Sequence, residues 1–276
     1  MALRARQKLG KYRIHRRLAT GGFAVVYSAR DTVEGIDVAL KVPHDHLLSR
    51  GVLDDFKKEA RLAAPLDHPN ILPIKTADEV EGQFAIVTRL GKETLAERLT
   101  RRLGKKTILV YAEQLLQALT FAHRRRIIHC DLKPENLILF PDNQLRLADF
   151  GIAKVARKTV STSGSGTIGY MAPEQAMGKP SMRSDVFSVG LLLYRMTTGE
   201  LPRWPFRWPM PGHERLVRGW HPAFVAMIRK ALQVDERRRF ATASQMLDAF
   251  QRIRSRAILE DRGNGNRRPT NGQATC

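Results

Sequence analysis

Two short polar motifs in the middle of the chain contain the residue types that phosphate chemistry needs. The first is HCDLKPEN at residues 129–136, and the second, DFG, begins thirteen residues after Asn136. Asp131 can orient an attacking hydroxyl and accept its proton, and Lys133 can stabilise charge on a phosphoryl group. Asn136 and Asp149 can hold Mg²⁺, because magnesium prefers oxygen ligands. A structural role alone does not explain these types at this spacing, so the two motifs predict phosphoryl transfer.

A glycine pair and a lysine upstream could bind the phosphates of a nucleotide. Gly21 and Gly22 lack a Cβ, which lets backbone N–H groups approach phosphate oxygens, although an ordinary hairpin turn also explains the pair. Lys41 ends the apolar run VALK, where a lysine could bind α- and β-phosphates or simply reach solvent. Glu59 could hold Lys41 in an ion pair, and a solvated glutamate on a helix surface is the alternative.

These upstream residues need strands and one helix to position them. Residues 11–90 alternate β-branched runs with turn residues, which predicts strands at Tyr12–Arg17, Ala24–Ala29, Asp37–Val42, Ile71–Ala77 and Gln83–Thr88. The stretch from Val52 to Leu66 interrupts this pattern with apolar residues at helical spacing. It predicts one helix, which carries Glu59.

The pattern becomes mostly helical from Glu93 onward. It predicts helices at Ile108–Arg125, Ser184–Thr198, Pro222–Gln233 and Ala243–Arg256, with short strands at Leu137–Phe140 and Gln144–Ala148. The segment Gly199–Trp220 is rich in tryptophan and proline and is interpreted as a packed region poor in helix, with substrate docking as the alternative. The whole pattern predicts an α+β fold with a small β-rich lobe and a larger α-helical lobe.

Composition narrows the class of protein. The chain has 276 residues, of which 43% are hydrophobic and 27% charged, enough to bury a large core or two lobes. No apolar run approaches the roughly 20 residues of a membrane-spanning helix, and the N-terminus lacks the apolar core of a signal peptide. Cys130 and Cys276 are too few for a disulfide framework. We therefore expect a cytoplasmic protein in a reducing compartment.

The net charge is strongly positive. There are 47 Lys and Arg against 27 Asp and Glu, which gives 47 − 27 = +20. Such an excess attracts nucleic acid, anionic lipid or acidic proteins. The basic residues are spread along the chain instead of forming one motif, so nucleic-acid binding is not the favoured interpretation. The segment Asp261–Cys276 has almost no apolar residues and is predicted to be disordered.

The order and spacing of these motifs resemble the protein kinase superfamily, and within it the bacterial Hanks-type Ser/Thr kinases. The resemblance covers roughly Lys11 to Arg254. It implies a bilobal kinase fold in an α+β class, with a small β-rich N-lobe containing one main helix. The implied organisation is a basic N-terminal extension at 1–10, a kinase domain at 11–254 with an N-lobe over about 11–88 and a C-lobe over about 91–254, and a disordered basic tail at 255–276.

The resemblance also assigns nucleotide-binding positions. The glycine-rich loop corresponds to Leu18, Ala19, Thr20, Gly21, Gly22, Phe23, Ala24, Val25 and Val26. Lys41 matches the strand lysine and Glu59 its helix partner. The positions that enclose adenine in the family correspond to Val26, Ala39 and Ile138. Thr88 matches the gatekeeper, and Arg89 and Leu90 resemble the hinge, with a one-residue gap in the alignment there.

The implied activity is transfer of the γ-phosphate of ATP to a Ser or Thr hydroxyl of a protein. Asp131 resembles the catalytic base, Lys133 the phosphate-contacting lysine of Ser/Thr kinases, and Asn136 and Asp149 the ligands of Mg²⁺ or Mn²⁺. Self-phosphorylation in the activation loop is a further implication. The alternatives are a pseudokinase or scaffold module, a small-molecule kinase, and nucleic-acid binding through the basic tail. The sequence gives no indication of the oligomeric state.

Further downstream, the resemblance implies structural roles and an activation segment. The segment ends in APE at 172–174, with Thr167 matching a threonine that contacts Asp131 and Lys133 in the family. Arg239 matches the buried arginine that pairs with Glu174. The aspartate that ties the central helix to the catalytic loop corresponds to Asp185.

Three departures from the family pattern affect four positions. Ala19 and Ala24 replace two glycines of the loop, at a cost of about 1 kcal/mol each if their φ angles are positive. Cys130 replaces the arginine that in most members binds an activation-loop phosphate. We therefore expect activity to depend little on phosphorylation of that loop. Arg89 replaces an acidic hinge residue, and we expect little effect from it.

Overall fold

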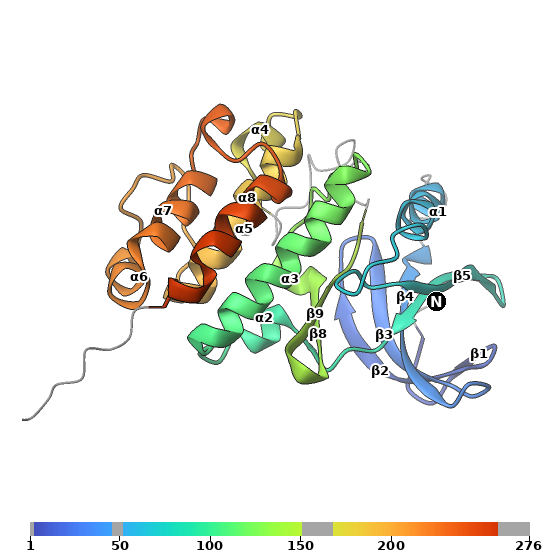
Figure 1. Cartoon of the computed structure of the whole chain (residues 1–276). Helices are drawn as coiled ribbons and strands as arrows, with labels where there is room; N and C mark the ends of the chain where they lie inside the picture. Colours follow the sequence, from blue (N-terminus) through green and yellow to red (C-terminus); the bar gives the residue numbers. More distant parts are fainter. Residues whose placement is uncertain (1–2, 46–51, 151–167, 259–276) are drawn as a thin grey trace, which may run out of the picture.

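The computed structural model describes residues 3–45, 52–150 and 168–258. One antiparallel sheet with a single long helix forms the N-terminal lobe, and helices dominate the C-terminal lobe (Figure 1). The predicted α+β, bilobal architecture is confirmed.

The N-terminal lobe is built on a six-stranded sheet with the order β1-β2-β3-β4-β6-β5. Its strands are β1 (Lys8–Leu9), β2 (Tyr12–Thr20), β3 (Ala24–Asp31), β4 (Ile36–Pro43), β5 (Ile74–Val80) and β6 (Gln83–Arg89). Residues of β4 alternate, so that Val38, Leu40 and Val42 enter the core on one face. Helix α1 (Val52–Ala63) packs on the sheet through Phe56, in a second cluster that includes Phe84 and Ile86.

The N-terminus differs from the predicted boundary at Lys11. Leu9 pairs with Tyr12 across β1 and β2, and Lys8 pairs with Arg13. Leu3 and Leu9 are only 9% and 2% exposed and belong to the core of the sheet. The basic residues of this segment concealed its apolar positions, and the segment packs with the lobe from Leu3 onward.

The C-terminal lobe contains the remaining described helices and a small sheet. The helices are α2 (Leu95–Arg98), α3 (Lys105–Arg124), α4 (Pro173–Ala176), α5 (Met182–Thr198), α6 (His213–Gly219), α7 (Pro222–Ala231) and α8 (Ala243–Ile253). The small sheet has the order β7 (Glu93–Thr94), β8 (Leu137–Phe140), β9 (Gln144–Leu147). Within the described ranges, no helix has both the length and the apolar character needed to cross a bilayer.

Helix α5 is the centre of this lobe, and its ends are encoded locally. Ser181 caps the first turn, where its hydroxyl accepts a hydrogen bond from the Arg183 N–H. Gly199 ends the helix with φ 80°, a left-handed conformation that glycine adopts without strain. Most of the residues between these two caps are buried. Helix α6 lies in the segment that the sequence analysis interpreted as poor in helix, so that interpretation was wrong for residues 213–219.

Candidate active site

Lys41, Glu59 and Asp149 meet where the two lobes join. Lys41 Nζ lies 2.9 Å from Glu59 Oε1 on α1 and 2.9 Å from Asp149 Oδ1, just after β9. The Glu59 side chain is 4% exposed and that of Lys41 13%. A parallel bridge between Ile71 and Leu147 holds the two lobes together nearby. The predicted Lys41–Glu59 pair is therefore present, and a second carboxylate shares the same ammonium group.

Sharing one lysine between two carboxylates determines their ionisation. Burial raises the pKa of Glu59 to about 7, although the Lys41 charge opposes this. Burial alone would also raise the pKa of Asp149, but the charge of Lys41 outweighs burial and the pKa is lowered. Burial tends to lower the pKa of Lys41, yet Asp149 and Glu59 outweigh it, so this pKa is raised. Asp149 and Lys41 thus form the ionised pair at neutral pH, and the pKa of Glu59 lies close to neutral pH.

Glu59 should make the folded protein less stable as the pH rises toward about 7. Its folded pKa lies above the ordinary 4.5, so the folded state binds this proton more tightly than the unfolded state does. The resulting stabilisation is full below pH 4.5 and is lost as the pH rises through about 7. The loss is on the order of 3 kcal/mol.

Glu59→Gln, which cannot ionise, should remove this part of the pH dependence. The measurement is the free energy of unfolding in urea at about pH 5 and about pH 8, for the wild type and the variant. The exposed Glu79 provides a matched control, since Glu79→Gln should keep the wild-type difference between the two pH values. A Glu59→Gln protein that keeps the full difference would contradict the assignment.

The catalytic-loop residues converge on Asp131. Asn136 Nδ2 donates to the backbone oxygen of Asp131 at 2.8 Å and to its Oδ2 at 3.0 Å. Lys133 Nζ lies 2.8 Å from the same Oδ2. Asp131 Oδ1 is buried and makes no hydrogen bond to any described residue. One carboxylate oxygen is thus fixed by two donors, and the other has no donor among the described residues.

The loop itself is held by the central helix. Asp185 of α5 accepts hydrogen bonds from the N–H groups of His129 (2.8 Å) and Cys130 (2.9 Å). These bonds support Cys130 in a left-handed conformation with φ 64°, which costs a non-glycine residue on the order of 1 kcal/mol. The predicted tie between Asp185 and the catalytic loop is present. His123 of α3 also binds Asp185, at 2.9 Å. The sequence analysis missed this residue, because a single histidine on a buried helix face gives no motif.

Cys130 and the activation segment meet at Gln175. The Cys130 thiol is buried, and its backbone oxygen accepts a hydrogen bond from Gln175 Nε2. Gly151, Thr167 and the hydroxyl residues of the activation segment lie in 151–167, outside the described residues. The expectation that activity depends little on phosphorylation of this segment therefore stays a prediction.

The glycine-rich loop is the hairpin between β2 and β3. The Gly21 N–H donates to the Ala24 oxygen at 2.8 Å, which closes the turn. Gly22 has open space where a Cβ would stand, with no atom within 4 Å. Ala19 and Ala24 lie in the paired strands and neither has a positive φ. The predicted conformational cost of these two alanines therefore does not arise.

The predicted adenine-enclosing residues of the N-terminal lobe share one face of the sheet. Val26 pairs with Lys41 across β3 and β4, and Ala39 pairs with Thr88 across β4 and β6. Directly opposed residues point to the same face, and so do Ala39 and Lys41, two positions apart. Ile138 comes from the other lobe, on β8, where it pairs with Thr94.

The segment that joins the two lobes passes very close to Ile138. Leu90 follows β6 and donates its N–H to Asp37 at 3.4 Å. A Cβ at Gly91 would lie 2.2 Å from Ile138 Cγ2 and 3.0 Å from the Leu139 oxygen. Only glycine fits this close approach. The sequence analysis did not single out Gly91, since nothing local to it indicates what it packs against.

A buried ion pair anchors the end of the activation segment. Arg239 Nη1 lies 2.8 Å from Glu174 Oε1, and Nη2 lies 2.9 Å from Oε2. The side chain of Arg239 is 0% exposed and that of Glu174 10%. The predicted Glu174–Arg239 pair is thus present, in a bidentate form.

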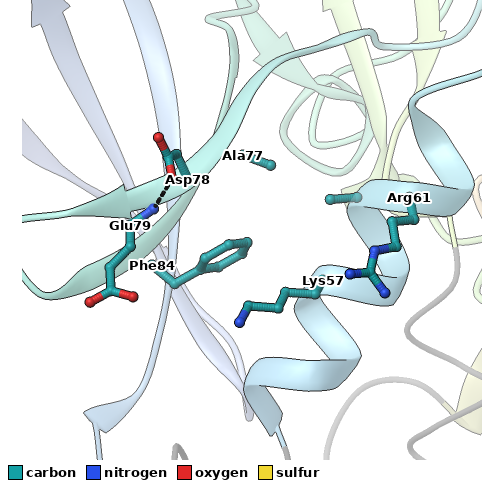
Figure 2. A pocket seen from close by; sticks show the side chains of 7 residues that line it. Lys57, Arg61, Ala77, Asp78, Glu79 and Phe84 are labelled. Atoms are coloured by element: carbon teal, nitrogen blue, oxygen red, sulfur yellow. Dashed lines mark hydrogen bonds between the residues drawn. The ribbon is translucent and has the colours of Figure 1, made fainter.

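A pocket outside this cluster lies between α1 and β5 (Figure 2). Its volume is about 310 Å³. Its lining residues are Lys57, Ala60, Arg61, Ala77, Asp78, Glu79 and Phe84. None of them is a predicted site residue, so the pocket is distinct from the cluster around Lys41 and Asp131.

Comparison with known proteins identifies the family of this arrangement. The chain is 34% identical over 201 residues to the Ser/Thr-protein kinase PrkC of Bacillus subtilis, and 37% identical over 206 residues to PknA of Mycobacterium tuberculosis. Each match covers 70% of this chain, but only 31% of PrkC and 48% of PknA. A probable Ser/Thr-protein kinase of Clostridium acetobutylicum is 30% identical over 272 residues, 91% of this chain and 41% of its own length. This chain thus spans less than half the length of these relatives.

The fold has solved counterparts as well. A crystal structure of the PknI kinase domain of Mycobacterium tuberculosis matches with a TM-score of 0.68 and 24% identity, over 91% of this chain and 99% of that one. The family model described as protein kinase domain matches residues 12–250. This chain therefore belongs to the protein kinase family.

Proposed function

We propose that this chain is a Ser/Thr protein kinase that transfers the γ-phosphate of ATP to a Ser or Thr hydroxyl of a protein. The observation that carries the proposal is the meeting of Lys41, Asp149 and Glu59 at the junction of the lobes, together with an Asp131 carboxylate oxygen that has no hydrogen-bond partner among the described residues. The named relatives support it, since all three are Ser/Thr kinases by name.

ATP would bind between the lobes. Val26 and Ala39 would cover adenine from the sheet and Ile138 from below, with Gly21 and Gly22 over the phosphates. Thr88, which shares a face with Ala39, would lie at the back of the adenine site. Lys41, positioned by Glu59 and Asp149, would bind the phosphates and set their orientation. In this scheme the short Lys41–Glu59 contact keeps α1 close to the nucleotide.

Gly91 should matter for nucleotide affinity because of its contact with Ile138. In Gly91→Ala the added methyl must displace either Ile138 or the connecting segment, and such overpacking costs about 1 kcal/mol or more. We expect the KM for ATP to rise about fivefold or more. Gly104→Ala is the control, because its Cβ would meet only Thr107 Oγ1, at 3.9 Å. Equal KM values for Gly91→Ala and the wild type would count against this placement of the adenine site.

A divalent cation fits Asn136 and Asp149. Asn136 uses its Nδ2 to bind Asp131, which leaves its Oδ1 as a ligand, and Asp149 uses Oδ1 to bind Lys41. An amide oxygen and a carboxylate oxygen suit Mg²⁺ and also Mn²⁺. When bound, the cation would neutralise charge on the β- and γ-phosphates.

In this scheme two residues of the catalytic loop, Asp131 and Lys133, accept the proton and stabilise the developing charge. Asp131 Oδ1 would accept the hydrogen bond of the attacking hydroxyl and then its proton. Lys133, held at Asp131 Oδ2, would stabilise the negative charge that develops on the transferred group. This lysine, two positions after the aspartate, is the feature that favours a Ser/Thr protein substrate.

The test is transfer of labelled γ-phosphate from ATP to a protein substrate and to the chain itself. The wild type should label Ser or Thr residues, and Lys41→Met and Asp131→Asn should not. Mapping of labelled peptides would then test self-phosphorylation between Thr159 and Ser165. If the wild type and both variants incorporate equal label, the chain is a pseudokinase or scaffold and the enzyme proposal fails.

A further inference from the structure

Arg195 is a half-buried cation of the C-terminal lobe whose hydrogen-bond partner is a neutral hydroxyl. It lies on α5, where most residues are fully buried, and is itself half-buried. Its Nη1 donates to the hydroxyl of Tyr170 at 2.5 Å, and its guanidinium carbon lies 6.0 Å from the centre of that ring. Among the described residues, no Asp or Glu forms an ion pair with Arg195. The sequence of 151–167 contains neither Asp nor Glu, so no acidic partner exists there either.

Tyr170 places this charge beside the catalytic loop. It ends the short turn Ile168–Tyr170, and its backbone oxygen accepts a hydrogen bond from Ser188 Oγ at 2.7 Å. Five positions further on, Gln175 donates to the Cys130 oxygen, next to Asp131. Burial raises the pKa of Tyr170 to about 12, and the negative charge of Glu135 from the catalytic loop adds to this rise. The turn, Arg195 and the catalytic loop are therefore neighbours.

The location matters because of how a protein substrate must approach. Lys41 belongs to β4 of the N-terminal lobe and contacts Asp149, so the nucleotide of the proposed function would lie on that side of Asp131. A polypeptide that presents a hydroxyl to Asp131 Oδ1 must then lie along the C-terminal lobe, over the segment that leads into α4. The guanidinium of Arg195 contacts the ring hydroxyl on this segment, so it is within reach of residues flanking the acceptor hydroxyl.

We propose that Arg195 binds an anionic side chain of the protein substrate close to the acceptor Ser or Thr, so that the kinase prefers acidic target sequences. The inference rests on the proposed kinase function and adds the chemistry of the substrate to it. A guanidinium has five N–H donors in a planar fork, and Tyr170 uses only one nitrogen of the three. The remaining donors match a carboxylate or a phosphate, which guanidinium groups bind in bidentate fashion.

Two physical arguments favour an external anion. Arg195 is half-buried and forms no ion pair among the described residues, so it has lost part of its hydration, and a bound carboxylate would restore part of the lost interaction. The net charge of +20 also attracts acidic polypeptides over long range, whereas Arg195 fixes the position at which the negative charge must lie. A role limited to fixing Tyr170 is the alternative, and it requires a hydrogen-bond donor but no charge.

Variants at position 195 separate these two roles. Arg195→Lys and Arg195→Gln both keep a donor for the Tyr170 hydroxyl, but only Arg195→Lys keeps the positive charge. Arg195→Glu reverses the charge. Each variant is assayed on a positional-scanning library of peptides around a fixed Ser or Thr, with an extra arm that carries phosphoserine. Arg252→Glu is the matched control, because it changes the charge by the same amount on the exposed face of α8.

We expect the wild type to favour Asp or Glu at one position by about tenfold in kcat/KM, which corresponds to about 1.4 kcal/mol. Arg195→Lys should keep most of this preference, and Arg195→Gln should lose it through KM while kcat changes little. Arg195→Glu should favour Lys or Arg at that same position, and Arg252→Glu should behave as the wild type does. In the extra arm, a higher kcat/KM for peptides with phosphoserine than with Glu at the selected position identifies the bound anion as a phosphate. A higher kcat/KM with Glu identifies it as a carboxylate.

The proposal is overturned if the wild type selects no acidic residue at any position, or if Arg195→Gln keeps the selection unchanged. The comparison of Arg195→Lys with Arg195→Gln tests the need for a positive charge even if Arg195→Glu does not fold. A wild type that labels no peptide and no protein refutes the kinase function itself, which is a different result from labelling without an acidic preference.

Discussion

We expect Asp131→Asn to lower the rate of the proposed phosphoryl transfer by about 10³-fold, within the range that a positioned general base contributes. This corresponds to about 4 kcal/mol of transition-state stabilisation. The asparagine keeps the shape of the side chain and one oxygen for the contacts from Lys133 and Asn136. It cannot accept the proton from the attacking hydroxyl, however. The loss should therefore appear in kcat, with the KM for ATP nearly unchanged, because Asp131 pairs with Lys133 and Asn136, whereas Lys41 pairs with Glu59 and Asp149.

The control for this variant is another aspartate changed in the same way. Asp142 lies in the exposed turn between β8 and β9, and Asp142→Asn should retain wild-type turnover. Both variants should unfold at the wild-type urea concentration, since Asp131 Oδ1 has no hydrogen bond to lose among the described residues. A residual rate in Asp131→Asn within tenfold of the wild type would show that this carboxylate is not the base.

Arg239→Ala should destabilise the folded protein by about 3–5 kcal/mol, the cost of leaving one partner of a buried ion pair uncompensated. The substitution leaves the Glu174 carboxylate buried with Ser184 Oγ at 2.6 Å as its remaining side-chain donor. It also removes the hydrogen bonds that Arg239 donates to the backbone oxygens of Gln233 (2.6 Å) and Val234 (3.1 Å). The measurement is the free energy of unfolding in urea.

The neighbouring arginine provides the control. Arg238 is 74% exposed and only 3.7 Å from Asp235, so Arg238→Ala should change stability by less than about 1 kcal/mol. Replacing both partners of the buried pair, as Glu174→Gln with Arg239→Met, should cost less than Arg239→Ala alone, because no charge is then left buried. Equal costs for Arg239→Ala and Arg238→Ala would mean that the pair does not anchor the segment.

The cluster of Lys41, Glu59 and Asp149 links stability to the proposed activity. Two carboxylates compete for one ammonium, and the titration of Glu59 decides whether α1 carries a negative charge toward the nucleotide site. When Glu59 is ionised, the two carboxylates carry one more charge than Lys41 neutralises. That surplus suits a site in which Asp149 is to meet a divalent cation and Lys41 is to meet phosphate.

The sequence alone determined the parts of the site that are close together along the chain. Asp131, Lys133 and Asn136 lie within six residues, and Pro134 restricts the backbone between them, so their side chains must meet. Strand alternation placed Ala39 and Lys41 on one face for the same local reason. The fold class could also be predicted, since a β-rich half followed by a helical half leaves few ways to bury both apolar faces.

Only the tertiary structure decided the contacts between residues far apart in sequence. Lys41 and Asp149 are 108 positions apart, and no periodicity indicates that they touch. The approach of Gly91 to Ile138 and the contact of Arg195 with Tyr170 arise in the same way. Local spacing fixes a distance because few dihedral angles intervene, whereas a long-range contact depends on how all the elements between the two residues pack.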